Sequence, residues 1–159
     1  MDSDSKTTFT VDRDNLQVVI TRVFDAPREL VFKACTDAAM IPQWWGPAKY
    51  TTVVDKLDLR VGGKWRFVQK DNNGQEFAFN GEYKEVTAPD KLVYTFEFEP
   101  MPGHVLTESI VLEDQGEKTL MTDSSHYANI QDLEGMVGMD MEGGAREGMV
   151  RLAELVEKQ

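Results

Sequence analysis

The feature that most constrains the fold is a run of strand-like segments over residues 51–126, each separated from the next by a turn signal. Gly62-Gly63 supplies the positive φ angles of a tight turn, and Asn73-Gly74 is one of the strongest short hairpin signals. Ala88-Pro89-Asp90 and Gln115-Gly116 mark further turns. The pattern predicts an antiparallel meander of about six strands.

A strand and a helix precede the meander. Leu16–Phe24 is rich in apolar and β-branched residues, which is typical of a largely buried strand. Pro27 suits the first position of a helix, where its missing N–H needs no partner, and this helix should end near Thr36–Asp37. Residues 38–45 add a short irregular turn, because Pro42 cannot lie deep inside a regular helix.

The C-terminal segment, residues 131–157, has the pattern of a long helix. Its apolar residues recur at spacings of three and four on one stripe: Met141, Ala145, Met149, Leu152 and Val156. Several glycines lie within it, and each costs about 1 kcal/mol relative to alanine in a helix. Either another group approaches this helix closely, or space is kept beside it, or the helix begins only near Met141.

The predicted order is therefore a strand, one or two short helices, the meander and a long helix, which is an α+β fold. A helix covering one face of an antiparallel sheet is a stable layer arrangement, and a strongly curved sheet would leave a cavity beneath the helix. A chain of 159 residues suits one core. We expect a single domain over residues 1–159, with residues 1–8 as a flexible tail.

Five segments occur in one order and at close spacing along residues 16–156: TRVFDAPRELVFKACTD, QWWGP, DLRVGGKWRF, GEYKEVTAPDKLVYTFEF and MEGGAREGMVRLAELV. Together they resemble the family named for homologues of the activator of the heat-shock-protein-90 ATPase (AHSA-type), within the START-like, or SRPBCC, superfamily. No single segment is decisive, because glycine hairpins and proline-started helices are common. The resemblance depends on all five in register.

The resemblance implies a helix-grip (START-like, Bet v-like) fold: a curved antiparallel sheet of about seven strands around a long C-terminal helix, in the order β-α-α-β6-α. It also implies a cavity between sheet and helix, which the superfamily uses for hydrophobic ligands. The eukaryotic chaperone activator has a further domain that contacts the chaperone, and we expect this chain to be too short to contain it. The family is often labelled stress-related, so a stress response is the implied context.

The charge of the chain argues against several classes of partner. Its net charge of −11, from 28 acidic and 17 basic residues, repels nucleic acids and anionic lipid surfaces, so we expect neither nucleic acid nor membrane as a partner. No apolar run approaches the ~20 residues of a membrane span, and the first residues lack an apolar signal core. Cys35 is the only cysteine, which excludes an internal disulfide and fits a cytoplasmic location.

Motifs for catalysis or cofactor binding are absent from the sequence. There are two histidines, and no HExxH, CxxC, Cys/His cluster or phosphate-binding glycine loop, so we predict no metal and no cofactor. In DSSHY, residues 123–127, neighbouring side chains point to opposite faces of a strand and make a poor catalytic triad. Cys35 is interpreted as a buried, inert residue. Three acidic residues are interpreted as part of a solvated outer face: Glu97, Glu99 and Glu108.

We therefore predict a binding protein for a small apolar or amphipathic molecule, held between the sheet and the last helix. Apolar walls would supply affinity, and a few polar groups would orient the ligand. The candidate wall residues are Trp44, Trp65, Phe67, Met141, Ala145 and Met149. The candidate polar residues are Arg66, Tyr94, His104 and His126. The methionines and aromatics are equally compatible with an ordinary core, and His104 with a solvated loop.

Two alternatives belong to other functional classes. An enzyme of the cyclase or hydratase kind would need an acid or base inside the cavity, and the sequence shows no convincing one, so we assign no catalytic residue. A chaperone-interaction module of the Hsp90 activator kind would show an exposed apolar patch. The sequence leaves open the identity of the ligand and whether the chain forms a homodimer.

The adjacent Trp44 and Trp45 lie between Pro42 and Pro47. One tryptophan is expected to fill the core between the helices and the sheet, while its neighbour points toward the cavity entrance or outward. Burial of both in the core is an equal alternative. Gly46 and Pro47 are expected to turn the chain into the first strand of the meander.

Overall fold

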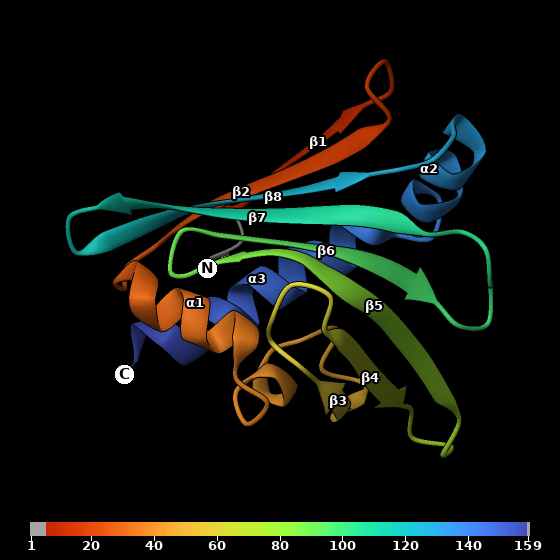
Figure 1. The fold of residues 1–159 in the computed structure, drawn as a ribbon, viewed down its shortest axis with the longest axis horizontal. Helices are drawn as coiled ribbons and strands as arrows, with labels where there is room; N and C mark the ends of the chain where they lie inside the picture. The colour runs from red at the N-terminus through yellow and green to blue at the C-terminus, as the bar shows by residue number, and fades with distance from the viewer. Residues whose placement is uncertain (1–5, 159) are drawn as a thin grey trace.

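The computed structural model describes residues 6–158, in which eight strands form one sheet that bends around the last helix (Figure 1). The strands are β1 (Thr8–Asp12), β2 (Gln17–Phe24), β3 (Thr51–Leu57), β4 (Lys64–Lys70), β5 (Glu76–Thr87), β6 (Lys91–Phe98), β7 (Leu106–Gln115) and β8 (Lys118–His126). The helices are α1 (Arg28–Thr36), the short 3-10 turn η2 (Ile41–Gln43), α2 (Ile130–Val137) and α3 (Met141–Glu157).

The sheet has the order β1-β2-β8-β7-β6-β5-β4-β3, and every neighbouring pair is antiparallel. Strands β3 to β8 form the predicted six-strand meander, and β2 pairs with β8, the last strand of the chain. The predicted α+β helix-grip fold is confirmed, with helix α1 and turn η2 inserted between β2 and β3. This order places α3 against the concave face of the sheet (Figure 1).

Two irregularities mark the meander. The register between β3 and β4 shifts at Val54/Lys56, and that between β5 and β6 shifts at Tyr83/Glu85. An extra residue on one strand of an antiparallel pair bends that strand and increases its twist. Both shifts lie in the half of the sheet that contains β3 to β6, so we attribute part of its curvature to them.

The structure adds one strand that the sequence did not reveal. Strand β1 pairs with β2 along its whole length, from Thr8 opposite Thr21 to Asp12 opposite Gln17. Its residues Phe9 and Val11 pack against the edge of the core, although the strand is only five residues long. Of the predicted tail, residues 1–5 lie outside the described residues, and Thr8 begins β1.

The C-terminal segment forms two helices instead of one continuous helix. Helix α2 ends at Val137, and Asp140 adopts a left-handed conformation with φ of 58° before α3 begins at Met141. The Asp140 side chain then accepts a hydrogen bond from the backbone N–H of Gly143 (3.3 Å), which caps the new helix. Of the interpretations the glycines allowed, a start near Met141 is therefore correct.

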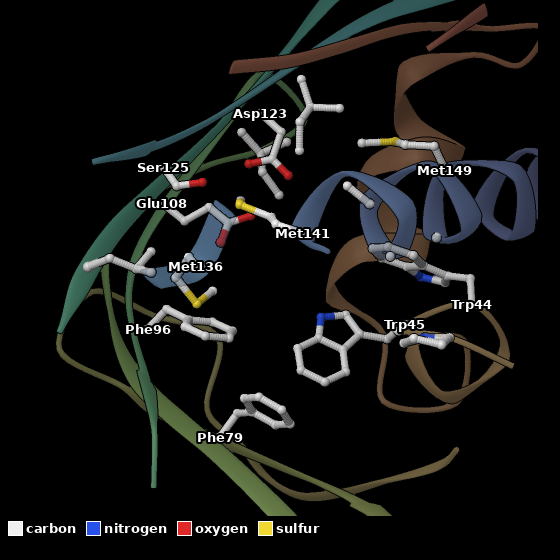
Figure 2. A pocket seen from close by; sticks show the side chains of 18 of the residues that line it. Trp44, Trp45, Phe79, Phe96, Glu108, Asp123, Ser125, Met136, Met141 and Met149 are labelled. Carbon is white, nitrogen blue, oxygen red and sulfur yellow. The ribbon is translucent and has the colours of Figure 1, made fainter. Parts of the chain in front are cut away.

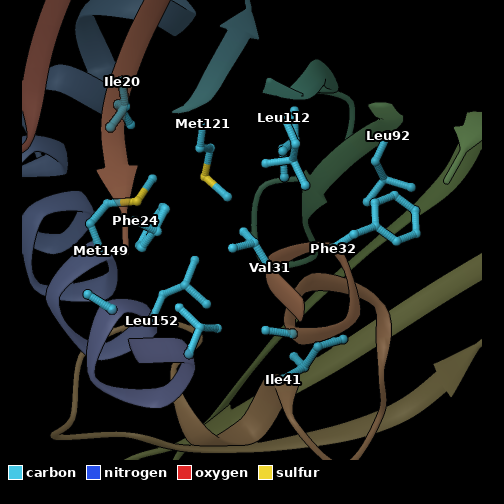
Figure 3. Packing of buried hydrophobic residues seen from close by; sticks show 14 of the residues in the cluster. Ile20, Phe24, Val31, Phe32, Ile41, Leu92, Leu112, Met121, Met149 and Leu152 are labelled. Carbon is cyan, nitrogen blue, oxygen red and sulfur yellow. The ribbon is translucent and has the colours of Figure 1, made fainter. Parts of the chain in front are cut away.

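The two halves of α3 face different surroundings. Its C-terminal half packs against α1 and the sheet, where Leu152 and Val156 join fully buried residues such as Phe24 and Val31 (Figure 3). Burying each such side chain contributes about 1.5–3 kcal/mol. The N-terminal half instead presents Gly144, Ala145 and Gly148. The core is therefore dense at one end of α3 and leaves space at the other.

A close approach between strands fixes the position of Trp65. Its indole Nε1–H donates to the carbonyl oxygen of Thr95 (3.2 Å), across Gly81 of the intervening strand β5. A Cβ atom at Gly81 would collide with that carbonyl oxygen and press on the indole. The contact therefore requires glycine at this position.

We predict that Gly81→Ala destabilises the protein by about 1–3 kcal/mol, because backbone and indole must both move to admit the methyl group. Gly135→Ala is the matched control: no atom lies within 4 Å of its new Cβ, and it lies within α2. It should stabilise the fold by about 0.4–1 kcal/mol. Urea unfolding measures both, and equal stability of the two variants would contradict this account of the close approach.

Candidate ligand-binding site

A cavity of about 320 Å³ lies between the concave face of the sheet and the N-terminal half of α3 (Figure 2). Its walls are mostly apolar, with aromatic side chains from β5, β6 and the loop after η2, and methionines from β8, α2 and α3. A volume of this size falls at the lower end of the range of small-molecule sites. The fold therefore supplies the cavity that the family resemblance implied.

Small residues on α3 keep this space open. A Cβ atom built on Gly144 or Gly148 would meet no other atom within 4 Å, although Gly148 itself is buried. Both glycines and Ala145 between them line the cavity. At these two positions glycine is thus not required by a close approach, and its effect is to leave the cavity unfilled.

Both tryptophans of the QWWGP segment line the cavity, and each is held in a different way. The Trp44 indole Nε1–H donates to the carbonyl oxygen of Ala34 near the end of α1 (2.8 Å). Trp45 packs edge-to-face on Phe67 and Phe79, with both ring centroids at 5.1 Å. Both side chains are half-buried. Each therefore joins the core on one side and faces the cavity on the other.

Helix α3 fixes the loop that carries these tryptophans. The Arg151 guanidinium donates to the carbonyl oxygens of Gly46 (2.6 Å) and Gln43 (3.1 Å). The Glu147 carboxylate accepts the backbone N–H of Ala48 (2.7 Å). Gly46 has a φ of 78°, a conformation that glycine adopts at little cost. Arg151 and Glu147 of α3 thus hold this part of the cavity wall in place.

The polar end of the cavity is formed by Glu108 on β7 and by Asp123 and Ser125 on β8. Glu108 lies directly opposite Ser125, and Asp123 lies directly opposite Ile110, so the two acidic residues are diagonal neighbours on one face of the sheet. Figure 2 shows both carboxyl groups pointing into the same part of the cavity, beside Met141. Two carboxyl groups therefore share one partly enclosed space.

Burial raises the pKa of both carboxyl groups. The pKa of Asp123 is well above its ordinary value of 3.8, because burial disfavours the charged form and the neighbouring Glu108 adds repulsion. The pKa of Glu108 is also raised by burial, although hydrogen bonds with Asp123 and Tyr94 oppose the rise. The pair therefore retains a proton at pH values where exposed carboxyl groups are ionised.

Two polar atoms that line the cavity have no hydrogen-bond partner within residues 6–158. They are Oδ1 of Asp123 on β8 and Nε2 of Gln69 on β4, an acceptor and a donor. By contrast, the Tyr127 hydroxyl donates to the sulfur of Met141 (3.4 Å). An unsatisfied buried polar atom costs about 1–3 kcal/mol. The cavity thus offers one unused acceptor and one unused donor.

Half of the residues proposed from the sequence lie on the wall of this cavity: Trp44, Tyr94, Met141, Ala145 and Met149. Trp65 and Phe67 are almost completely buried, with 2% and 6% of their surface exposed. They border a separate void of about 30 Å³ beneath the tryptophans. These two aromatics therefore support the cavity wall from behind.

The remaining three proposed residues lie elsewhere. Arg66 is on the opposite face of β4 and forms ion pairs with Glu99 (2.8 Å) and Asp55 (3.3 Å). His126 is exposed at the end of β8. His104 is also exposed, and its Nδ1 lies 2.8 Å from Asp132 of α2, beside a second hollow of about 120 Å³. None of the three lines the main cavity.

The sequence interpretation missed the two acidic residues of the cavity. Glu108 was expected on a solvated outer face, and the structure corrects this: it lies on the concave face with Leu106 and Ile110. The signal was present, because Leu106, Glu108 and Ile110 alternate along one strand and share a face. The same reasoning places Asp123 with Met121 on β8. An acidic residue two positions from a buried apolar residue on the same strand lies on the same face as that residue. This pattern predicts the acidic residues of the site.

The thiol of Cys35 is a weak nucleophile. Burial raises its pKa to about 12, so the reactive thiolate is scarce at neutral pH. Within residues 6–158 no group of three or more His, Cys, Asp and Glu side chains is placed to hold a metal ion. No helix in the same range is long and apolar enough to cross a membrane.

Comparison with known proteins agrees with this architecture. The family model described as "Activator of Hsp90 ATPase homolog 1-like protein" matches residues 25–157. The chain belongs to this family. The match covers α1, the whole meander and the two C-terminal helices, so the family resemblance seen in the sequence is confirmed. A search of curated proteins gave no match.

Solved structures of other proteins show the same fold. A protein from Arthrobacter aurescens has a TM-score of 0.89 at 23% identity, covering 96% of this chain and 92% of its own. Protein Ms6760 from Mycobacterium smegmatis has a TM-score of 0.85 at 24% identity, covering 95% and 97%. An HSP90 activator from Plasmodium falciparum has a TM-score of 0.56 at 24% identity, covering 70% and 73%. At these identities the similarity establishes the fold.

We predict that Asp123→Asn stabilises the protein at neutral pH and not at acid pH. Because the folded state raises the pKa of Asp123, its contribution to stability is fully present below the unfolded pKa of about 3.9 and is lost as the pH rises through the folded value. Asparagine does not ionise, so the Asp123→Asn variant does not lose this stability as the pH rises. The variant should therefore gain at least about 1 kcal/mol near pH 7 and little near pH 4.

Thermal unfolding of both proteins over this pH range provides the measurement. Glu113→Gln is the matched control, because Glu113 is exposed at the far end of β7 and its replacement removes the same charge. Its effect should be small at every pH. A gain for Asp123→Asn that is equal at the two pH values would contradict the proposed origin in a buried carboxyl group.

Proposed function

We propose that the chain binds a small, largely apolar molecule in the cavity between the sheet and α3, with the polar part of that molecule at Glu108 and Asp123. The observation that carries this proposal is the open space beside Gly144 and Gly148, which adjoins buried polar atoms without partners. Protein interiors are normally close-packed and hydrogen-bonded. A cavity that departs from both rules is best explained by a ligand that fills it.

The size and lining of the cavity limit the ligand. A volume of about 320 Å³ corresponds to about ten molecules of liquid water, so the ligand should have at least roughly ten non-hydrogen atoms. Aromatic rings of Trp45, Phe79 and Phe96 form one wall, and Met141 and Met149 form another. Methionine side chains adapt to varied apolar shapes. The lining therefore favours a flat or flexible apolar body.

A chaperone-interaction module is the second candidate, and one observation besides family membership supports it. Three apolar side chains are exposed around the second hollow, at 48% for Met101, 43% for Val105 and 66% for Met139. Exposed apolar groups of this kind suit a protein partner. This function would fit the stress-related context of the family. It would use the outer surface near α2 and not the main cavity.

The carboxyl pair also supplies the acid that an enzyme would need inside the cavity. A protonated carboxyl group in an apolar site can donate a proton at neutral pH. We rank catalysis below binding, because the described residues that line the cavity include no histidine, lysine or cysteine to serve as partner or nucleophile. We retain a cytoplasmic location as part of the proposal, supported by the single buried thiol.

We predict that an apolar fluorescent dye binds the purified protein at one saturable site and raises its melting temperature. A ligand present at a hundredfold excess over its Kd, and selective for the folded state, stabilises the fold by about 2.7 kcal/mol. Binding should also change tryptophan emission. Trp45→Phe should reduce that change, because Trp45 lines the cavity together with Trp44, whereas Trp65→Phe should retain it.

Gly148→Leu tests whether the dye occupies the cavity. The new side chain extends into open space, so it should fill the cavity while leaving the fold intact. Gly135→Leu is the matched control, because Gly135 on α2 lines the second hollow and not this cavity. We expect dye binding to be lost only in the first variant. Saturable binding that survives Gly148→Leu would place the dye elsewhere and contradict the proposal.

A further inference from the structure

The charged side chains of the cavity all have one sign. Among the described residues that line it, Glu108 and Asp123 are acidic, and there is no lysine, arginine or histidine. A ligand carboxylate or phosphate would therefore meet repulsion at the polar end. The net charge of −11 acts in the same direction, because it raises the local concentration of cations and lowers that of anions.

The unpartnered atoms specify the kind of polar group that fits. Oδ1 of Asp123 is a buried acceptor with no donor among residues 6–158, and a ligand N–H or O–H would satisfy it. The diagonal position of Glu108 places a second carboxyl group beside the first. An ammonium group has three donors and a positive charge, so it can bond to both carboxyl groups at once. A hydroxyl group donates a single hydrogen bond and brings no charge.

The apolar wall of the cavity suits the rest of such a ligand. Trp44, Trp45 and Phe96 line the same cavity, and aromatic rings pack favourably against one another. Apolar surroundings exclude water and strengthen the attraction between opposite charges. An apolar amine therefore finds a complementary surface for both of its parts.

We propose that the cavity selects an arylalkyl amine, bound as the ammonium ion between Glu108 and Asp123 with its aromatic body against the tryptophan and phenylalanine wall. The inference rests on the proposed function and names its ligand class. Gln69 adds a second requirement. The Nε2 donor of Gln69 has no acceptor in the described part of the chain, and the residue is only 5% exposed. Because Gln69 lines the wall on β4, it would donate a hydrogen bond to an ether or hydroxyl oxygen on the aromatic body.

This proposal implies that binding of the amine releases a proton. The free pair retains a proton because burial raises the pKa values of Glu108 and Asp123. An ammonium ion between them favours the ionised forms, so the proton leaves to solvent as the ligand enters. Affinity for the amine should rise with pH until the amine itself loses its proton, near pH 10 for a lysine-like amine. Among the described residues that line the pocket, the remaining titratable side chains are those of Tyr94 and Tyr127.

Calorimetric titration with three molecules of one skeleton tests the proposal: phenylbutylamine, phenylbutanol and phenylbutyrate. At neutral pH the amine should bind at least about tenfold more tightly than the alcohol, and the carboxylate most weakly. Titrations in two buffers of different ionisation enthalpy count the protons released. We expect release with the amine and none with the alcohol.

Two isosteric variants locate the effect. Asp123→Asn and Glu108→Gln should each weaken amine binding by at least about tenfold and change alcohol binding by less than about threefold. Glu113→Gln, on the exposed end of the same strand as Glu108, should change neither. If one variant fails to fold, the other variant and proton release by the unmodified protein still decide the question.

The outcomes separate this inference from the proposed function. Equal binding of amine and alcohol, abolished for both by Gly148→Leu, would overturn the amine inference and leave the binding function standing. Tightest binding of phenylbutyrate would also overturn the amine inference. Failure of all three molecules and of apolar dyes would overturn both proposals. A methoxy group on the phenyl ring should improve amine affinity, and Gln69→Leu should remove that gain; no gain would overturn the role of Gln69.

Discussion

The wrapping of one antiparallel sheet around α3 is the constraint on which the rest of the structure depends. The C-terminal half of the helix fills the concave face with Leu152 and Val156, while the N-terminal half carries glycine and alanine. Because the C-terminal half holds the helix against the sheet, the N-terminal half cannot move inward to close the space beneath it. The cavity is therefore a consequence of uneven side-chain size along a single helix. Arg151, on the same helix, also holds the tryptophan loop through Gly46 and Gln43.

The carboxyl pair shows what this uneven packing permits. Buried carboxyl groups are costly, and a sheet face filled only with apolar residues would be more stable. Glu108 and Asp123 remain tolerable because they open onto a cavity and can share a proton. Under the amine proposal, a ligand with a positive charge would offset this cost. Stability and binding would then be linked at these two residues, so a substitution that stabilises the ligand-free protein should weaken its selectivity for amines.

The sequence predicted the architecture better than the site. Turn signals such as Asn73-Gly74 define the meander without reference to distant residues, and the α+β order followed from them. Strand β1 was missed because five alternating residues give a weak signal. The part of the cavity wall on α3 was predicted from the apolar stripe that begins at Met141. Arg66 was placed wrongly in space because a strand exposes alternate residues, and the sequence alone does not say which face is concave. The position of Glu108 in the cavity was not predicted for the same reason, because the sequence did not show which face of β7 is concave.

A direct measurement on the ligand-free protein tests the central claim, that a carboxyl pair forms the polar end of a partly enclosed, mostly apolar cavity. NMR titration of the side-chain carboxyl carbons of Glu108 and Asp123 follows their protonation residue by residue. The structure predicts midpoints above the ordinary values of 4.5 and 3.8, with each titration curve broadened by the other group. Independent titrations at the ordinary values would show that both groups are fully solvated, and would contradict the claim that they share a partly enclosed cavity.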